Sequence, residues 1–249
     1  MDRLRAQHNL RTGVWDRLRA VARPDSRLHY DFGQMHPDFE GSEAAAERFI
    51  GSELPPGLGL VFAAPDNALQ SARAVLLARG CRIIVSTYCM RRGFRLLDPA
   101  RIAPADFAYA ASLDGLERFG EDVSLARIAS MSRLDLALTG SAAVTINGVR
   151  YGRSYQYFDI EWGILTELGV ADERTPVAVI VHEVQLTDDK IMPMPREAVP
   201  DYIVTSMRTI RLPDRPKRPV GVDWAGLDAD EVDRMPALVE LLQARGVRR

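Results

Sequence analysis

A strand, a helix and a second strand follow one another directly between residues 58 and 87, and this order limits the fold more than any other feature of the sequence. Residues 58–64 (LGLVFAA) and 81–87 (CRIIVST) are short apolar runs typical of strands, and residues 67–79 predict a helix that ends at Gly80. A helical crossover makes the two strands a parallel pair, which helices cover on both faces. The sequence therefore predicts an α/β protein.

Other apolar runs extend the same alternation of strands and helices. Strands are expected at residues 134–140, 142–146, 176–186 and 201–207, and a minor hairpin is expected between residues 94–97 and the segment around Ile102. Helices are expected at residues 2–22, from Ser42 to about Leu54, in part of 104–119, and at 230–245. We predict a single domain over residues 1–249, a three-layer αβα fold with a mainly parallel sheet, on which the first and last helices pack.

Composition narrows the class of protein. The chain has 249 residues, of which 47% are apolar and 27% charged, and its apolar runs are too short to cross a bilayer. The N-terminal residues carry charges throughout and lack the apolar segment of a secretory signal, so we expect a cytoplasmic protein without a membrane partner. A net charge of −2 argues against broad binding to nucleic acid. We expect a small-molecule substrate and a monomer or homodimer.

Several common catalytic patterns do not occur in the sequence. The four histidines have no spacing typical of zinc ligands, and the two cysteines, Cys81 and Cys89, form no disulfide framework. There is no Gly-x-Ser-x-Gly elbow, no Walker A pattern and no Gly-x-Gly-x-x-Gly after a first strand. Zinc chemistry, covalent catalysis and the standard nucleotide folds are therefore disfavoured.

Residues 147–169 combine a hairpin turn, a loop and the start of an amphipathic helix. Asn147-Gly148 predicts a two-residue hairpin turn, and Asp159 can cap the helix that follows. Backbone N–H groups, the helix N-terminus, Arg150 and Arg153 would converge where a phosphate could bind, with Asp159 or Glu161 holding a metal ion. A surface loop before a well-capped helix explains the same residues equally well.

We expect two segments to meet at one cleft. Residues 150–161 are predicted to lie at its mouth, at the carboxyl ends of the parallel strands, where open α/β sheets bind ligands. The loop of residues 31–43 is predicted to fold over the cleft and to place Phe39 and Glu43 beside the substrate. The alternative is a surface loop packed by Phe32 and Phe39.

Short pieces spread over nearly the whole chain resemble one known family in their order and spacing. They are Leu10-Arg11 with Val14-Trp15, Pro37-x-Phe39-x-Gly41-x-Glu43-Ala44-Ala45, Leu97-Asp98-Pro99, residues 135–144, Gly152-Arg153 through Tyr157 with Asp159 and Glu161, Val181-His182, residues 199–205, and Arg218-Pro219-x-Gly221-x-x-Trp224. The chain resembles the 5-formyltetrahydrofolate cyclo-ligase (methenyltetrahydrofolate synthetase) family, and more closely its divergent cyclo-ligase-like branch.

The resemblance implies a fold of the ribose-phosphate isomerase and coenzyme-A transferase type and a ligase that uses ATP and Mg²⁺. In the family, the formyl oxygen of 5-formyltetrahydrofolate is phosphorylated, an amine closes the ring and phosphate leaves. The family's loop reads Gly-Lys-Gly-Gly-Gly-Tyr-x-Asp. By resemblance, Arg153, Tyr157 and Glu43 are catalytic, the ATP contacts are Arg11, Arg150, Gly152, Arg153 and Ser154, Asp159 binds magnesium, and Phe39 and Glu43 contact the substrate.

The same loop also departs from the family, since Ser154, Tyr155 and Gln156 stand where the family has three glycines. Three functions stay open. The first is an ATP- and Mg²⁺-dependent enzyme that activates a formyl or amide oxygen for ring closure, on 5-formyltetrahydrofolate or a related small N-acyl compound. The second is a non-catalytic ligand-binding or regulatory module whose phosphate loop is plugged. The third is an enzyme that acts in the same cleft without ATP, for instance by hydrolysis.

Overall fold

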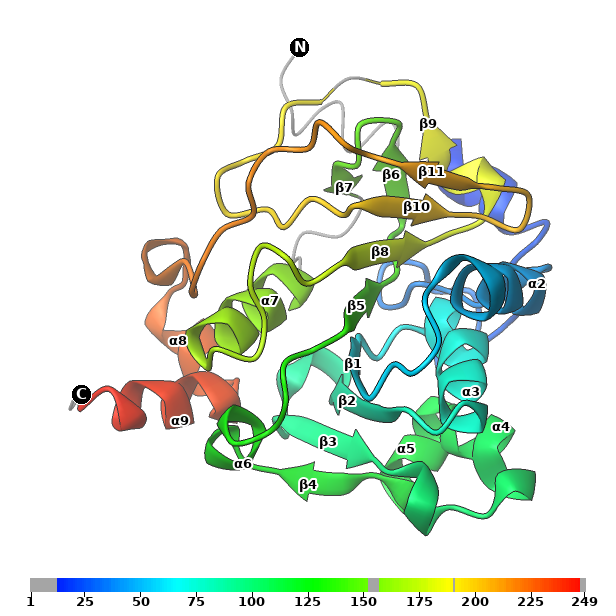
Figure 1. Ribbon diagram of the computed structural model, residues 1–249. Coiled ribbons are helices and arrows are strands. Elements are labelled where there is room, and N and C mark those ends of the chain that lie inside the picture. The colour runs from blue at the N-terminus through cyan, green and yellow to red at the C-terminus, as the bar shows by residue number, and fades with distance from the viewer. Residues whose placement is uncertain (1–12, 152–156, 190, 247–249) are drawn as a thin grey trace.

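Five parallel strands form the centre of the molecule. The computed structural model describes residues 13–151, 157–189 and 191–246. An eight-stranded sheet has the order β11-β10-β8-β5-β1-β2-β3-β4, and the strands from β10 to β2 run parallel (Figure 1). The parallel strands are β1 (Leu60–Ala63), β2 (Arg82–Ser86), β5 (Leu136–Thr139), β8 (Val177–Ile180) and β10 (Tyr202–Val204). The crossover predicted between residues 58 and 87 is confirmed, because β1 and β2 are parallel neighbours joined by α3.

Helices cover both faces of this sheet, so the predicted three-layer αβα arrangement is confirmed (Figure 1). One side carries α2 (Ser42–Arg48), α3 (Gln70–Ala78), α4 (Phe107–Ala110) and α5 (Leu113–Phe119). The other carries α6 (Leu125–Ala129), α7 (Tyr157–Glu167), α8 (Ala229–Asp233) and α9 (Pro236–Ala244). β1, β5 and β8 are buried at every position, as the apolar runs require for strands covered on both faces.

A second, three-stranded sheet was not expected. It has the order β7-β6-β9 and is built from β6 (Ala143–Thr145), β7 (Arg150–Tyr151) and β9 (Leu186–Thr187). β6 and β7 form the predicted hairpin, but the prediction of a two-residue turn is wrong. Thr145 N–H donates to Val149 O and Gly148 N–H to Thr145 O, so residues 146–148 form a three-residue loop in which Gly148 has a φ of 88° and Asn147 does not have a positive φ.

Two further expectations are corrected at the edges of the fold, and one edge strand was not expected. β3 (Phe94–Leu97) forms no hairpin with the Ile102 segment, because it pairs with β2 on one side and with β4 (Glu121–Val123) on the other. The C-terminal helix is divided into α8 and α9, since Pro236 holds Met235 in an extended conformation. β11 (Thr209–Arg211), an antiparallel edge strand, was not predicted.

The N-terminal helix is shorter at its described end than predicted. Residues 13–18 are helical, and Ala22 instead pairs with Phe39 in an isolated β-bridge, so the helix stops before residue 22. The part of this prediction that covers residues 2–12 lies outside the described residues.

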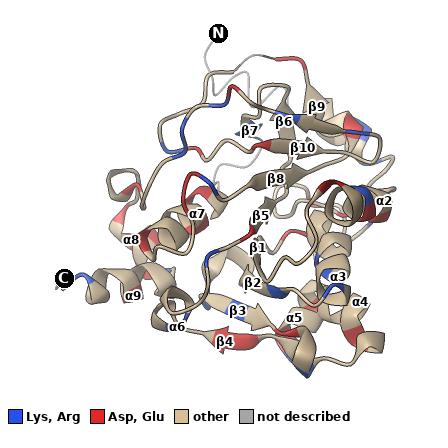
Figure 2. Cartoon of the chain, in the orientation of Figure 1, with Lys and Arg blue, Asp and Glu red and all other residues tan. Residues whose placement is uncertain are grey.

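Acidic and basic side chains are interspersed along the helices and loops around the sheet (Figure 2). Many of them form ion pairs at the surface, such as Arg127 with Glu121 and Arg174 with Asp172. Within the described ranges, no helix is both long and apolar enough to cross a membrane.

Candidate functional site

A pocket lies at the carboxyl ends of the central strands. Its floor comes from residues that directly follow β1 and β2 or end β5: Ala64, Pro65, Asp66, Asn67, Tyr88, Cys89 and Thr139. The hollow holds about 560 Å³, with the open solvent at its mouth included. Open α/β sheets bind ligands at this edge, where the strands end and the chain turns away from the sheet.

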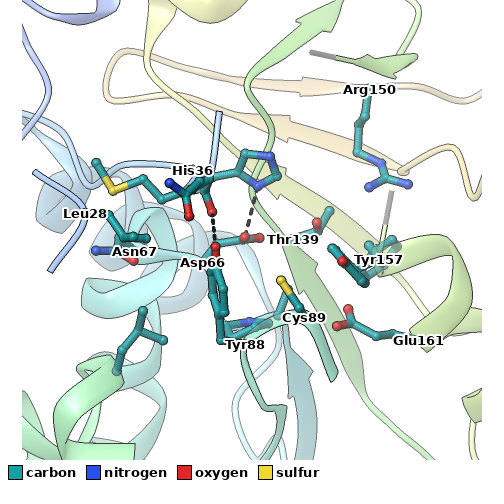
Figure 3. A pocket seen from close by; sticks show the side chains of 16 residues that line it. Leu28, His36, Asp66, Asn67, Tyr88, Cys89, Thr139, Arg150, Tyr157 and Glu161 are labelled. Atoms are coloured by element: carbon teal, nitrogen blue, oxygen red, sulfur yellow. Dashed lines mark hydrogen bonds and ion pairs between the residues drawn. The ribbon is translucent and has the colours of Figure 1, made fainter. Parts of the chain in front are cut away.

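Two segments distant in sequence complete the pocket wall (Figure 3). Gln34, Met35 and His36 come from the loop that was predicted to fold over the cleft. The second set, Arg150, Tyr157, Phe158 and Glu161, comes from the segment predicted to lie at its mouth. The described residues at both ends of the segment 150–161 therefore lie at the carboxyl ends of the parallel strands, as the sequence predicted.

Glu161 is the most deeply buried carboxyl in the pocket. Its side chain comes from the first turns of α7 and the residue is only 1% exposed. Ser86, at the end of β2, donates a hydrogen bond to Oε1, whereas Oε2 has no hydrogen-bond partner among the described residues. Burial raises the pKa of Glu161 to about 8, which the Ser86 hydrogen bond opposes and the charge of Asp66 reinforces. Glu161 is therefore a protonated acid at neutral pH, able both to donate and to accept.

Arg150 and Asp159 form a buried ion pair beside the pocket. The Arg150 side chain is 3% exposed, and its guanidinium lies 4.7 Å from the centroid of the Phe158 ring. Asp159 Oδ1 accepts from Arg150 and, at 2.9 Å, from the N–H of Ala198. Burial raises the pKa of Asp159, and the charge of Arg150 opposes that shift.

This pairing decides whether Asp159 fits the magnesium role that the resemblance implies. Its carboxylate faces an arginine and a backbone N–H, and it does not line the pocket. In the part of the chain that the structure describes, no three His, Cys, Asp or Glu side chains gather as metal ligands. The residues around Asp159 therefore do not fit a magnesium ion in this arrangement.

His36 and Asp66 form a second polar pair in the pocket. His36 Nδ1 lies 2.9 Å from Asp66 Oδ1, and Asp66 Oδ2 accepts the N–H of Gly140 at 2.7 Å. Glycine at position 140 leaves room for Asp66, since a Cβ there would lie 3.1 Å from two atoms of the Asp66 side chain, a tight contact. The buried guanidinium of Arg73 donates to the carbonyls of Ala64 and Asp66, which fixes the turn after β1.

The turn after β2 holds an unusual backbone conformation. Cys89 and Met90 have φ values of 53° and 56°, which side-chain-bearing residues rarely adopt. Thr87 closes this turn, because its hydroxyl donates to Gly93 O and accepts from Arg92 N–H. Strained residues of this kind concentrate at functional sites. The same turn is tied to the covering loop by the Tyr88 hydroxyl, which donates to Gln34 O at 3.0 Å.

The structure does not bring every predicted site residue to the pocket. Phe39 is fully buried in the main core, where its ring packs edge-on against His182, so it is a packing residue. Glu43 lies at the surface and pairs with Arg23, which also pairs with Asp38. Neither lines the pocket, because the chain turns from the pocket into α2 between His36 and Glu43. Arg11, Gly152, Arg153 and Ser154 lie outside the described residues.

Sequence reasoning missed His36, Asp66 and Ser86. A signal was present for two of them, since Asp66 and Ser86 are polar residues at the carboxyl ends of apolar runs predicted as strands. No local pattern in the sequence identifies His36, because its contact with Asp66 depends on how the loop of residues 31–43 folds over the pocket.

The fold and the pocket together define an α/β protein with a candidate ligand pocket at the carboxyl edge of a mainly parallel sheet. No family model matches the chain. Methenyltetrahydrofolate synthase domain-containing proteins are similar to it: the Bos taurus protein is 27% identical over 241 residues, 95% of this chain and 62% of the relative. The Homo sapiens protein is 28% identical over 213 residues, 82% of this chain and 54% of the relative. The chain thus spans less than two thirds of the length of these relatives.

These sequence similarities confirm the resemblance of the chain to the cyclo-ligase family. Among solved structures, the NMR structure of Aquifex aeolicus 5,10-methenyltetrahydrofolate synthetase overlaps with a TM-score of 0.48 at 14% identity, covering 88% of this chain and 97% of that chain.

Proposed function

We propose that the chain is a cyclo-ligase-like enzyme that activates a formyl or amide oxygen for ring closure, on 5-formyltetrahydrofolate or a related small N-acyl compound. The observation that carries the proposal is the Glu161 carboxyl, which is buried in a pocket at the carboxyl edge of the sheet and whose Oε2 has no hydrogen-bond partner among the residues that the structure describes. The names of the related proteins, which include methenyltetrahydrofolate synthase, support the substrate class.

The pocket offers suitable groups for an acyl oxygen. A protonated Glu161 donates a hydrogen bond to that oxygen and so draws electron density from the acyl carbon, which favours attack by a neighbouring amine. Tyr157 and Phe158 line the same pocket as Glu161 and supply aromatic surface against which a flat ring of the substrate can pack. ATP, as the family resemblance implies, would supply a phosphoryl group that makes the oxygen a leaving group, with Gly152, Arg153 and Ser154 as its proposed contacts.

A second candidate function, the non-catalytic module, is favoured by the Arg150–Asp159 pair. Each residue neutralises the other, so the described part of the proposed phosphate and magnesium site is already satisfied within the protein. A chain of this kind binds the N-acyl compound without converting it.

The direct test is the conversion of 5-formyltetrahydrofolate to its 5,10-methenyl form, followed by absorbance, in the presence of ATP and Mg²⁺. We expect turnover by the wild-type chain and a loss of about 100-fold in Glu161→Gln, because the amide is a poorer acid. Glu43→Gln, at the exposed Arg23 pair, is the matched control and retains the wild-type rate if Glu43 has only a surface role. Binding of 5-formyltetrahydrofolate without turnover would favour the module instead.

A further inference from the structure

The His36–Asp66 pair belongs to the same pocket but has no part in the ring closure described above. We propose that this pair activates a water molecule, so that the pocket also hydrolyses small N-formyl compounds without a nucleotide. The proposal takes its substrate class from the proposed function. Its catalytic residue comes from an independent observation, the geometry of His36.

The hydrogen bond to Asp66 sets the state of the imidazole ring. A carboxylate can only accept, so the 2.9 Å contact between His36 Nδ1 and Asp66 Oδ1 places the ring proton of a neutral His36 on Nδ1. Nε2 then carries the lone pair, and no described residue gives it a hydrogen-bond partner. Figure 3 shows the His36 ring above Asp66, in the pocket that Arg150, Tyr157 and Glu161 also line. The ring therefore presents a proton acceptor to a molecule bound there.

Asp66 is held firmly enough to orient the ring. The His36 and Asp66 side chains are 11% and 12% exposed, and the second carboxylate oxygen of Asp66 accepts from Gly140. Its backbone carbonyl accepts from Arg73, which also donates to Ala64 and Ala111. An imidazole oriented by a fixed carboxylate is an arrangement that supports general-base catalysis.

The proposed reaction is balanced by water alone. The oxygen of water attacks the formyl carbon while His36 Nε2 takes one of its protons. The C–N bond then breaks, and the imidazolium returns that proton to the leaving amine nitrogen, giving the free amine and formic acid, which ionises to formate in water. Arg150 and Glu161 line the same pocket, and their N–H and O–H groups are donors that the developing oxyanion can use. No oxidant, reductant or phosphate donor is consumed.

The experiment measures formate released from 5-formyltetrahydrofolate and from N-formylglycine by the full chain, with a chelator present and no nucleotide. We expect the wild type to release formate from at least one of these compounds. In His36→Asn the rate should fall by at least about 100-fold, because a general base accelerates a reaction on the order of 10² to 10⁴-fold. The matched control is His29→Asn, an exposed histidine with a φ of 51°, which asparagine tolerates. This control should keep the wild-type rate.

Three results would overturn the proposal. They are no formate from wild type with either compound, an unchanged rate in His36→Asn, or loss of the rate in Cys89→Ala, which would point to the pocket thiol as nucleophile. The wild-type result does not depend on whether a variant folds. Methenyl formation with ATP and Mg²⁺, measured on the same sample, separates the two activities: methenyl without formate keeps the proposed ligase and rejects hydrolysis, and formate without methenyl does the reverse.

Discussion

Two carboxyl groups two positions apart on α7 are in opposite situations. Asp159 is matched to Arg150 and a backbone N–H, whereas Glu161 has a single hydroxyl partner on one oxygen and none among the described residues on the other. Burial disfavours the charged form of both, but only Asp159 faces a countercharge at hydrogen-bond distance. We therefore assign Asp159 to the structure of the protein and Glu161 to its pocket.

Glu161 is expected to make stability depend on pH. Its pKa is about 8 in the folded protein against 4.5 in the unfolded chain, so the native state binds the extra proton between these values. Its contribution is complete below pH 4.5 and is lost as the pH rises through about 8, at roughly 1 kcal/mol per pH unit. Urea unfolding from pH 5 to 9 should show this fall in wild type and a flatter profile in Glu161→Gln. Identical slopes would contradict the assignment.

The Arg150–Asp159 pair is expected to be strongly coupled. Removing one partner leaves the other charge buried, so Arg150→Met and Asp159→Asn should each lower the free energy of unfolding by about 3 kcal/mol. The double variant should lose much less than the sum, because no unpaired charge is left. A double-mutant cycle in urea measures the coupling. Additive losses would show that the pair does not act as a unit.

At the scale of elements, α7 carries the pocket carboxyl and is held by the segment that precedes α8. Trp162 Nε1 donates to Pro219 O, and Gly221 N–H donates to the Thr166 hydroxyl. The Arg218 guanidinium stacks over the Trp162 ring at 4.9 Å. These contacts fix the rotation of α7 and therefore the direction in which Glu161 points.

At Gly163, helix α7 packs closely against the segment that contains Gly221 and Val222. A Cβ there would lie 2.7 Å from Gly221 O and 2.9 Å from Val222 Cα, so Gly163→Ala should push the segment away and cost about 1 to 3 kcal/mol. Gly13→Ala is the matched control: Gly13 is helical with nothing within 4 Å of its Cβ position, and alanine there should stabilise by up to about 1 kcal/mol. Thermal unfolding measures both, and equal midpoints would refute the packing argument.

At the scale of the whole molecule, the pocket exists because the strand order brings three turns to one edge. β1 lies between β2 and β5, so the residues after each of these strands are neighbours. The small sheet of β7, β6 and β9 stands beyond this edge and delivers Arg150 to it. A ligand that bound here would contact segments from at least five parts of the chain and so stabilise the folded state as a whole.

Nucleotide binding is testable through that stabilisation. If Arg153 holds a polyphosphate, ATP with Mg²⁺ should add about 2.7 kcal/mol at a hundredfold excess over Kd and raise the thermal midpoint by a few degrees. Arg153→Ala should abolish the shift, while Arg234→Ala, at an exposed arginine that directly follows α8, should keep it. No shift in wild type at millimolar ATP and Mg²⁺ would favour the plugged module.

The sequence by itself determined the parallel centre of the sheet, the crossover helix between β1 and β2, and the region of the pocket. These follow from apolar runs, helix periodicity and turn residues, which are local patterns whose meaning does not depend on distant partners. The three-residue hairpin loop, the division of the last helix and the second sheet were missed because alternative local geometries satisfy the same pattern.

Only the tertiary structure decided which side chains line the pocket and how they pair. His36 meets Asp66 across 30 positions and Ser86 meets Glu161 across 75, while Asp159 is matched to Arg150 and not exposed to a metal ion. Phe39, which the sequence placed at the substrate, lies in the core because the chain turns into α2. Burial and countercharge set the protonation of each group, and both are properties of the assembled fold that no local stretch of sequence contains.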